Sequence, residues 1–449
     1  MQGVWRSAQR PVTWGIISAV DASGGAGTGP RPPVRVGIIG CGRILPAHLD
    51  GLRRLKQRGA ARFVVTALCA RRREDAEMFR RRGAGPPPRA PVLAANDPLA
   101  VPHLYVSDFQ PEPLPDVLTD YRDLVAADVA DAFIVTTSLE THHDVAVRAL
   151  EAGKHVLMEK PLAVTVRAAR RMVEAAERSG AVLATAENAR YREEARAARW
   201  AVDAGLLGEP QMVLGGGIGA GVWSPNLVIA ETPWRHEKRR AGGGPVIDLG
   251  VHRFDVLRYV CGPIATVSGL VRTFEPQRVL RDLAGGEHGL FPSDVEDAAF
   301  AQLAFANGAI GHYVFSWGAH GEQFHLPGGR LVWGSRGSLL GRQLTLDGGE
   351  QHDVVELFRA RAPELHARYF PFGLDDDPYG MALEQLDFFR AIAEGRQTEV
   401  SGREGLRDLA IAYAVIESSV AGRPVTVDEL ERGAVDAYQR EIDAHYGLA

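Results

Sequence analysis

Lysine is scarce in this chain. Of its 51 lysine and arginine residues only four are lysines, at positions 56, 154, 160 and 238, and arginine fills nearly every other basic position. A lysine can shift its pKa on burial and exchange a proton, whereas an arginine stays charged. A lysine in a cleft therefore has a chemical use that arginine could not serve.

Cysteines and long apolar runs are also few. Cys41, Cys69 and Cys261 lie far apart, which offers neither a disulfide framework nor a metal-ligand spacing and suits a reducing cytosol. No apolar run reaches the roughly 18 to 20 residues of a membrane helix. The net charge of −5 shows no basic excess, which argues against nucleic acid as a partner. We therefore expect a cytoplasmic protein without a metal, a membrane or a nucleic-acid partner.

The length of 449 residues exceeds what one hydrophobic core usually supports, so we expect two domains. The apolar run at residues 14–20 follows Arg6 and Arg10, but it is short for a signal peptide and no small-residue cleavage site follows. Residues 1–33, which are rich in glycine and proline towards their end, are predicted to form a flexible leader.

Residues 34–39 form an apolar segment that predicts a strand, and a helical pattern follows from Pro46. Between them Gly40 allows a tight turn and Gly42 lets the backbone approach a pyrophosphate, which is the context of a dinucleotide-binding turn. Leu45 occupies the place of the third small residue, so the helix and the strand are expected to pack further apart than usual. The cofactor candidates in this turn are Gly40, Gly42, Arg43 and Ile44.

The next predicted strand, residues 63–68, ends without the acidic residue that binds the ribose of NAD. Ala70 stands near that place, and Arg71 and Arg72 could instead pair with a 2′-phosphate. We therefore favour NADP slightly over NAD. A solvated helix start, with an arginine stacked on the adenine of either cofactor, is the alternative. The proline-rich residues 83–102 and 111–115 predict surface insertions between strands, which could lie over the cofactor.

Residues 155–161 place a lysine at the end of a strand. Pro161 fixes its own backbone and favours extended geometry for Lys160, so the strand and the lysine end together at the ligand-binding edge of a parallel sheet. A solvated lysine is the alternative. Predicted strands and helices alternate through residues 34–187, which indicates a parallel sheet. Thr137 and His142 lie at another strand end and could line the nicotinamide side or cap a helix.

Residues 242–257 predict a helix that begins near Pro245. Spacings of four and three put Asp248, His252 and Asp255 on one face of it. A carboxylate beside a histidine can fix its tautomer and raise its pKa, as a general base needs. A polar face in water is the alternative, and a metal site lacks a third ligand.

Trp234 and Arg235 could stack on and clamp a polyhydroxylated substrate, or the tryptophan could belong to the core. Tyr191, which follows the last strand predicted in the first half, is a further candidate for substrate contact. Alternating residues between 265 and 346, with a turn at Asn307-Gly308, predict antiparallel strands. Residues 381–420 are helical in pattern, and residues 428–449 are predicted to form a C-terminal tail.

Several motifs together resemble the Gfo/Idh/MocA oxidoreductases, the family of glucose-fructose oxidoreductase and inositol dehydrogenase. They are Gly40-Cys-Gly42 with His48 in the following helix, residues 149–156, Glu159-Lys-Pro161, and Gly242-Gly-Gly with Asp248 and His252 four residues apart. The resemblance covers residues 34–427. It implies an α/β Rossmann domain at 34–187, followed by an α+β domain at 188–427 with an open, mostly antiparallel sheet that commonly forms a homodimer or homotetramer.

The resemblance also implies hydride transfer between nicotinamide and a secondary carbinol of a sugar or cyclitol. Lys160 would then hydrogen-bond the reacting oxygen, His252 exchange the proton, and Asp248 orient the pair, while Glu159 joins the cofactor-binding residues. A glycosidase that retains NAD and a nucleotide-binding regulator are the alternatives, although the intact trio argues against the regulator. We also predict a cis peptide bond before Pro161.

Overall fold

A computed structural model describes residues 32–89, 97–219, 227–229, 232–282, 286–317 and 320–448 of the chain. The predicted leader lies outside these residues except for its last two, and so does part of the predicted insertion at 83–102. Among the described residues, no helix is long and apolar enough to cross a membrane.

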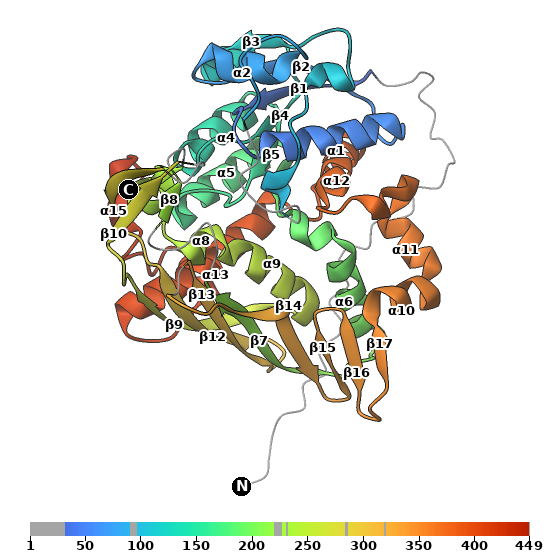
Figure 1. The fold of residues 1–449 in the computed structure, drawn as a ribbon, viewed down its shortest axis with the longest axis vertical. Coiled ribbons are helices and arrows are strands. Elements are labelled where there is room, and N and C mark those ends of the chain that lie inside the picture. The colour runs from blue at the N-terminus through green and yellow to red at the C-terminus, as the bar shows by residue number, and fades with distance from the viewer. Residues whose placement is uncertain are drawn as a thin grey trace. The chain divides into compact units, whose positions relative to one another are not determined.

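The first half of the chain folds around a six-stranded parallel sheet (Figure 1). Its strands are β1 (Val34–Ile39), β2 (Phe63–Cys69), β3 (Asp116–Leu118), β4 (Ala132–Val135), β5 (His155–Glu159) and β6 (Leu183–Ala186). Their spatial order, β3-β2-β1-β4-β5-β6, is that of a Rossmann dinucleotide-binding fold. The helices are α1 (Leu45–Gln57), α2 (Arg73–Arg80), α3 (Tyr121–Ala126), α4 (His142–Glu151), α5 (Val166–Ser179) and α6 (Glu193–Asp203), with short 3-10 turns η1 (Pro98–Ala100), η2 (Val106–Asp108), η3 (Leu139–Thr141) and η4 (Asn188–Tyr191).

The ends of these elements follow from local sequence. The Lys160–Pro161 bond that closes β5 is cis, as predicted. Helix α5 begins where the Thr165 side chain accepts the backbone N–H of Ala168, and it ends at Gly180, whose positive φ of 71° suits glycine. Leu45, in the place of the small residue, is fully buried at the start of α1.

The second half is built on a nine-stranded sheet of order β17-β16-β15-β14-β7-β13-β12-β9-β18. Among the described residues, β7 and β13 are its only parallel neighbours, so the predicted open, mostly antiparallel sheet is confirmed. These strands are β7 (Pro210–Ile218), β9 (Ile264–Arg272), β12 (Ala298–Phe305), β13 (Ile310–Ser316), β14 (Phe324–Gly334), β15 (Gly337–Leu340), β16 (Gln343–Leu346), β17 (Gln351–Asp353) and β18 (Val425–Thr426). A small sheet of β8 (Leu227–Ile229), β10 (Gln277–Arg281) and β11 (Glu287–Pro292) stands beside it, which the sequence did not predict.

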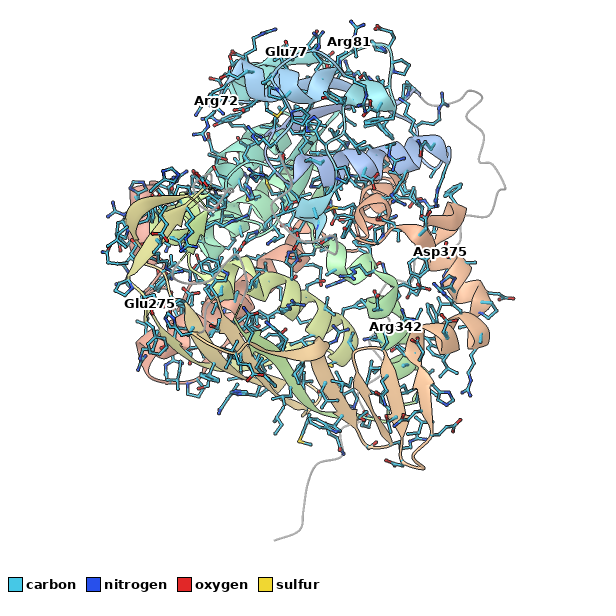
Figure 2. All side chains as sticks on the ribbon, viewed as in Figure 1. Arg72, Glu77, Arg81, Glu275, Arg342 and Asp375 are labelled. Carbon is cyan, nitrogen blue, oxygen red and sulfur yellow. The ribbon has the colours of Figure 1, made fainter. Side chains whose placement is uncertain are left out.

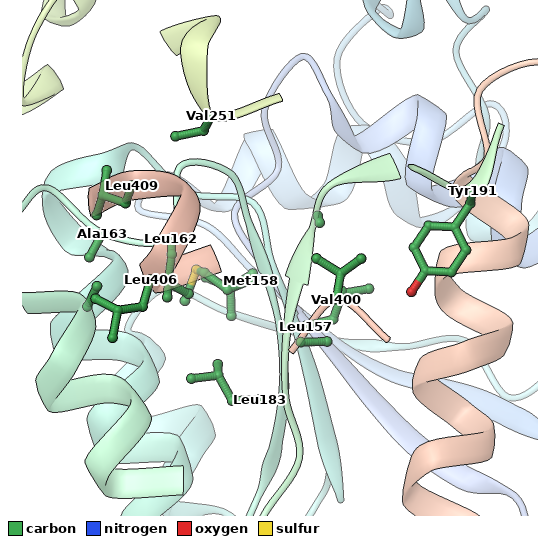
Figure 3. Packing of buried hydrophobic residues seen from close by; sticks show 14 of the residues in the cluster. Leu157, Met158, Leu162, Ala163, Leu183, Tyr191, Val251, Val400, Leu406 and Leu409 are labelled. Carbon is green, nitrogen blue, oxygen red and sulfur yellow. The ribbon is translucent and has the colours of Figure 1, made fainter. Parts of the chain in front are cut away.

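The remaining helices lie in the second half of the chain. They are α7 (Lys238–Ala241), α8 (Pro245–Asp248), α9 (Gly250–Cys261), α10 (Val354–Arg361), α11 (Pro363–Tyr369), α12 (Met381–Glu394), α13 (Gly402–Ala421), α14 (Val427–Glu431) and α15 (Arg440–His445), with 3-10 turns η6 (Pro233–His236) and η7 (Pro371–Asp376). In Figure 1, α9 and α13 lie between the nine-stranded sheet and the Rossmann half. Figure 3 shows Leu406 and Leu409 of α13 close to Leu162 and Ala163, just beyond the end of β5.

The C-terminal third of the chain completes the Rossmann half. The edge strand β6 is covered by the segment before α13, where the backbone N–H of Thr185 donates to Val400 O over 2.9 Å and Ala184 bridges to Ser401. The predicted tail packs on α5, because Asp443 Oδ1 accepts the Thr165 hydroxyl over 2.6 Å. These contacts join residues more than 200 positions apart, which local patterns do not reveal.

Candidate active site

Lys160 lies at the carboxyl end of β5 and is held by α8. Its Nζ donates to the backbone oxygen of Asp248 over 2.8 Å and lies 3.4 Å from Asp248 Oδ1. The lysine side chain is only 19% exposed, so it is not the solvated strand-end residue of the alternative interpretation. The structure brings Lys160 and Asp248 together as the sequence predicted.

Asp248 is a permanently charged partner. Burial alone would raise the pKa of its carboxyl, but the charges of Lys160 and of Arg235, whose Nη1 lies 3.7 Å away, outweigh burial and lower the pKa to about 2. Asp248 therefore stays ionised at neutral pH and is suited to holding the lysine rather than to exchanging a proton.

His252 differs from the prediction in its partner and in its pKa. Helix α8 ends at Asp248 and α9 begins at Gly250, so Asp248 and His252 belong to two short helices. His252 Nδ1 is hydrogen-bonded to Glu187 Oε2, beyond the end of β6. Burial and the nearby charge of Lys160 lower the pKa of His252 to about 3, where a raised pKa was expected.

Asp255 does not join this trio. Its carboxylate is fully buried and binds the guanidinium of Arg190, with Nε 3.2 Å from Oδ2. Helical spacing placed it on the same face as His252, but the buried arginine of η4 takes it away from the pocket. Asp255 therefore acts on the site through its charge and not by contact with a ligand.

Glu159 is fixed immediately before the lysine. Its Oε1 accepts a hydrogen bond from His48 Nε2 over 2.8 Å, and its Oε2 accepts the backbone N–H of Lys160 over 3.0 Å. Burial would raise the pKa of Glu159, but the hydrogen bond to His48 outweighs it and the pKa is lowered. Gln385 of α12 holds His48 in turn, through a 3.0 Å bond from its amide to the His48 carbonyl.

A glycine turn anchored by Glu296 presents Asp248 to the lysine. The Glu296 carboxylate accepts the backbone N–H groups of Gly244 and Val246 over 2.8 and 3.1 Å. A Cβ on Gly244 would lie 1.8 Å from the Glu296 carbonyl oxygen, so only glycine fits there. Burial raises the pKa of Glu296 to about 7 although both N–H groups favour the charged form. No motif in the sequence pointed to Glu296.

These groups surround a pocket of about 410 Å³, a volume that suits a small ligand. Nine predicted site residues line it: Ile44, Thr137, His142, Glu159, Lys160, Trp234, Arg235, Asp248 and His252. His142 is buried, and its ring nitrogens Nδ1 and Nε2 lie 3.0 and 3.2 Å from the carbonyl oxygens of Pro161 and Thr137, so the ring lies between two strand ends. The guanidinium carbon of Arg235 lies over the Trp234 ring, 4.6 Å from the ring centroid.

Tyr191 is not brought into the pocket, in contrast to the prediction. It is buried, and its hydroxyl donates to Asp387 of α12 over 2.9 Å. The structure instead adds Asp97, Tyr379 and Arg192 to the lining. Asp97 begins η1 and accepts the backbone N–H of Leu99 over 2.8 Å, so the predicted insertion does reach the pocket.

Except for Ile44, the predicted cofactor turn lies beyond this lining, and it has the shape that a pyrophosphate needs. Gly40 has a φ of 102°, and a Cβ there would come within 2.6 Å of the Thr136 carbonyl. A Cβ on Gly42 would meet only Thr136 O, at 3.9 Å, so no neighbouring protein atom requires glycine at that position. Open space above Gly42 fits close approach of a dinucleotide to the backbone. Arg43, in the same turn, is also outside the lining.

Three arginines gather near this turn. Arg72 projects from the start of α2, at the edge of the molecule (Figure 2), and pairs with Asp75 over 2.9 Å. Arg71 precedes it and is exposed. Arg89 of the insertion also pairs with Asp75, and its Nη1 donates to the Cys41 carbonyl over 3.1 Å. Arg89 was not predicted, because its position depends on how the insertion folds back onto the rest of the domain.

Two family descriptions match the chain. Residues 34–187 match an oxidoreductase family with an NAD-binding Rossmann fold, and residues 195–340 match the C-terminal domain of GFO/IDH/MocA proteins. The predicted family and oxidoreductase activity are thereby confirmed, and the parallel and mostly antiparallel sheets confirm the fold class.

Curated relatives are enzymes of sugars and cyclitols. The chain is 30% identical to 1,5-anhydro-D-fructose reductase of Ensifer adhaerens, over 69% of this chain and 84% of the relative. It is 27% identical to levoglucosan dehydrogenase of Pseudarthrobacter phenanthrenivorans, over 70% and 84%. It is 25% identical to myo-inositol 2-dehydrogenase of Thermotoga maritima, over 88% and 99%.

The solved structures agree on the fold. An oxidoreductase domain protein from Kribbella flavida matches with a TM-score of 0.69 at 25% identity, over 88% of this chain and all of that one. Levoglucosan dehydrogenase in complex with NADH matches with a TM-score of 0.66 at 24% identity, over 88% and 99%.

Proposed function

Because the chain belongs to the Gfo/Idh/MocA family of NAD(P)-dependent oxidoreductases, we propose that it transfers a hydride between nicotinamide and a secondary carbinol of a sugar, sugar derivative or cyclitol. The observation that carries the proposal is one pocket lined by Lys160, Asp248 and His252 beside the carboxyl ends of the Rossmann strands. The named relatives act on levoglucosan, inositol and anhydrofructose, which are all polyhydroxylated rings.

The chain's residues divide the work. Bound nicotinamide supplies the hydride chemistry, and side chains of the protein bind and transfer the proton of the reacting hydroxyl. Lys160 points a hydrogen-bond donor at the reacting oxygen, where Asp248 fixes its direction. His252 exchanges the proton at the pocket wall, and Trp234 with Arg235 supports the ring of the substrate.

The test is reduction of NAD and NADP by a panel of inositols, anhydrosugars and aldoses, followed by absorbance of the reduced nicotinamide. Net reduction that depends on a polyol supports a dehydrogenase. A glycosidase that retains NAD recycles its hydride and would cleave a glycoside without net reduction, and a regulator would bind the cofactor but turn over nothing.

For the cofactor, we propose that NADP is used slightly better than NAD, since Arg71, Arg72 and Arg89 are near the glycine turn and no acidic residue takes the ribose position. Replacing Arg71 and Arg72 together by alanine is expected to raise the KM for NADP by about tenfold or more, as the loss of charge-assisted hydrogen bonds implies, with little change for NAD. Steady-state kinetics with both cofactors measure this. An equal rise for both would contradict the preference.

We also propose a homodimer or homotetramer formed by the open face of the nine-stranded sheet. Large apolar side chains are exposed there: Met212, Leu214, Leu270, Phe300, Ile310 and Phe324. Leu270 and Phe300 are direct cross-strand neighbours, 63% and 48% exposed. The opposite face is covered by α13, where the Ser418 hydroxyl accepts the backbone N–H of Gly269 over 3.1 Å. A contiguous apolar face of this kind is typical of an interface.

Leu270→Asp combined with Phe300→Asp is expected to convert the oligomer to a monomer, because two charges would be buried at the interface. Analytical ultracentrifugation measures the mass. Leu290→Asp is the matched control, because Leu290 is 71% exposed but belongs to the small three-stranded sheet. An unchanged mass in the double variant would contradict this interface.

A further inference from the structure

Glu187 lies directly behind the pocket histidine. It follows β6, its side chain is 1% exposed, and its Oε2 is hydrogen-bonded to His252 Nδ1. The His252 side chain is 24% exposed and lines the pocket. With Nδ1 bound to the carboxylate, Nε2 is the ring nitrogen that meets a substrate. No family motif in the sequence pointed to Glu187, although it ends a parallel strand as Lys160 does.

The charges around this pair come from several elements. They are Asp255 and Arg253 on α9, Lys160 and Glu159 at the end of β5, Arg190 on η4, Asp248 on α8, Glu384 on α12 and Asp408 on α13. Burial and then the negative charge of Asp255 raise the pKa of Glu187 well above its usual range. Burial and Lys160 lower that of His252. A proton held by the pair therefore resides on the carboxyl group.

This arrangement answers a difficulty for the histidine as a base. An imidazole with a depressed pKa, next to an ammonium group, is a poor final acceptor for a proton. Asp248 cannot help, because the pKa of its carboxyl is about 2 and it is bound to Lys160. A buried carboxylate in direct contact with the far ring nitrogen can take the proton and leave the ring neutral.

We propose that Glu187 is a positioning residue and proton reservoir, which passes a proton through His252 to and from the reacting hydroxyl. The inference rests on the proposed dehydrogenase function. In alcohol oxidation the carbinol C–H bond breaks and its hydride goes to nicotinamide. The hydroxyl O–H proton goes to Nε2 of His252, and the proton on Nδ1 moves to Oε2 of Glu187. Reduction of the ketone reverses both transfers, so His252 begins and ends neutral.

The test is Glu187→Gln, which keeps the shape and a hydrogen bond but cannot store a proton. In the wild type, Glu187 must be deprotonated before alcohol oxidation. The value of kcat/KM therefore falls as the pH drops below the pKa at which the Glu187–His252 pair takes up a proton. In E187Q only the depressed pKa of His252 remains. The acid limb is therefore expected to move to lower pH, while the plateau of kcat falls by roughly 10²-fold because the acceptor is a weaker base.

Glu384→Gln is the matched control. Glu384 is 2% exposed, and its carboxyl oxygens have no hydrogen-bond partner within the described part of the chain. Glu384 makes no hydrogen bond to His252, so the contact between Glu187 and His252 stays in place in E384Q and the acid limb is expected to stay near its wild-type position. A merely structural role for Glu187 would lower the rate without moving the acid limb, and that result would overturn the proposal.

Two further measurements keep the test decisive. If E187Q binds no cofactor, Glu187→Asp is measured in its place. An acid limb of kcat/KM at the wild-type pH supports the proposal. An acid limb moved to the lower pH that is expected for His252 without a carboxylate partner overturns it. Infrared difference spectra between the wild type and folded E187Q need no substrate, and glutamine, unlike aspartate, has no carboxyl group. Loss of a protonated-carboxyl band in the variant supports the reservoir, and its persistence contradicts it. If the wild type oxidises no polyol, the proposed function fails while the spectra still decide on Glu187.

Discussion

Lys160→Met is expected to lower kcat by about 10³-fold, within the range that general acid–base groups contribute, and to leave cofactor binding largely unchanged. Methionine keeps the length and apolar stem of lysine but removes the ammonium that donates to the Asp248 carbonyl. The loss falls on the chemical step, because the Gly40 turn that fits the pyrophosphate is untouched. Turnover with the best polyol of the panel and fluorescence titration of the cofactor measure the two effects.

Lys154→Met provides the control for this variant. Lys154 immediately precedes the same strand, but its Nζ pairs over 3.4 Å with Asp128, which is 85% exposed. Lys154 is as buried as Lys160 but does not line the pocket, and a pair with a largely exposed carboxylate contributes little to stability. Wild-type turnover in K154M together with collapse in K160M assigns the effect to the pocket lysine. Near-normal turnover in K160M would refute its role.

Arg258→Met is expected to destabilise the protein by about 3–5 kcal/mol, as for other buried ion pairs that lose one partner. Arg258 on α9 is 4% exposed and binds Asp408 over 2.6 Å and Glu404 over 2.9 Å, both on α13. Without the guanidinium, the fully buried Asp408 carboxylate loses this partner, while Glu404 keeps Arg190 at 3.4 Å. Denaturant unfolding at neutral pH, compared with the wild type, gives the free-energy difference.

Arg342→Met is the matched surface control. Arg342 makes a two-bond contact with Asp353, at 2.9 and 3.0 Å, but the two side chains are 47% and 38% exposed. Figure 2 shows Arg342 on the strands at the outer end of the large sheet. We expect a loss of less than about 1 kcal/mol. Equal losses in R258M and R342M would show that burial does not decide the contribution of these pairs.

Sequence patterns predicted what depends on neighbours along the chain. The proline after Lys160 predicted the end of β5, and the Gly40 turn predicted the start of a Rossmann fold; both follow from backbone rules that act over a few residues. The four-residue spacing of Asp248 and His252 did place both in one pocket, although through two helices rather than one.

The partners of these residues could not be predicted from local patterns. Glu187 meets His252 from a position 65 residues away, and Gln385 meets His48 across 337 residues. Such pairs are set by how the sheets and helices pack. A strand end is nevertheless a usable signal, since Glu187 follows β6 as Lys160 follows β5. This signal holds only close to the strand end. Tyr191 lies four residues beyond Glu187, and its side chain points into the core.

The covering of β6 by Val400 and Ser401 has a consequence for synthesis. During translation Thr185 is synthesised long before its partner Ser401, which follows 216 residues later. At roughly 5–20 residues per second, one edge of the nascent Rossmann sheet stays open for about 10–40 s. An unpaired strand edge can pair with a strand of another chain. We therefore expect the nascent chain to depend most on chaperones during this interval.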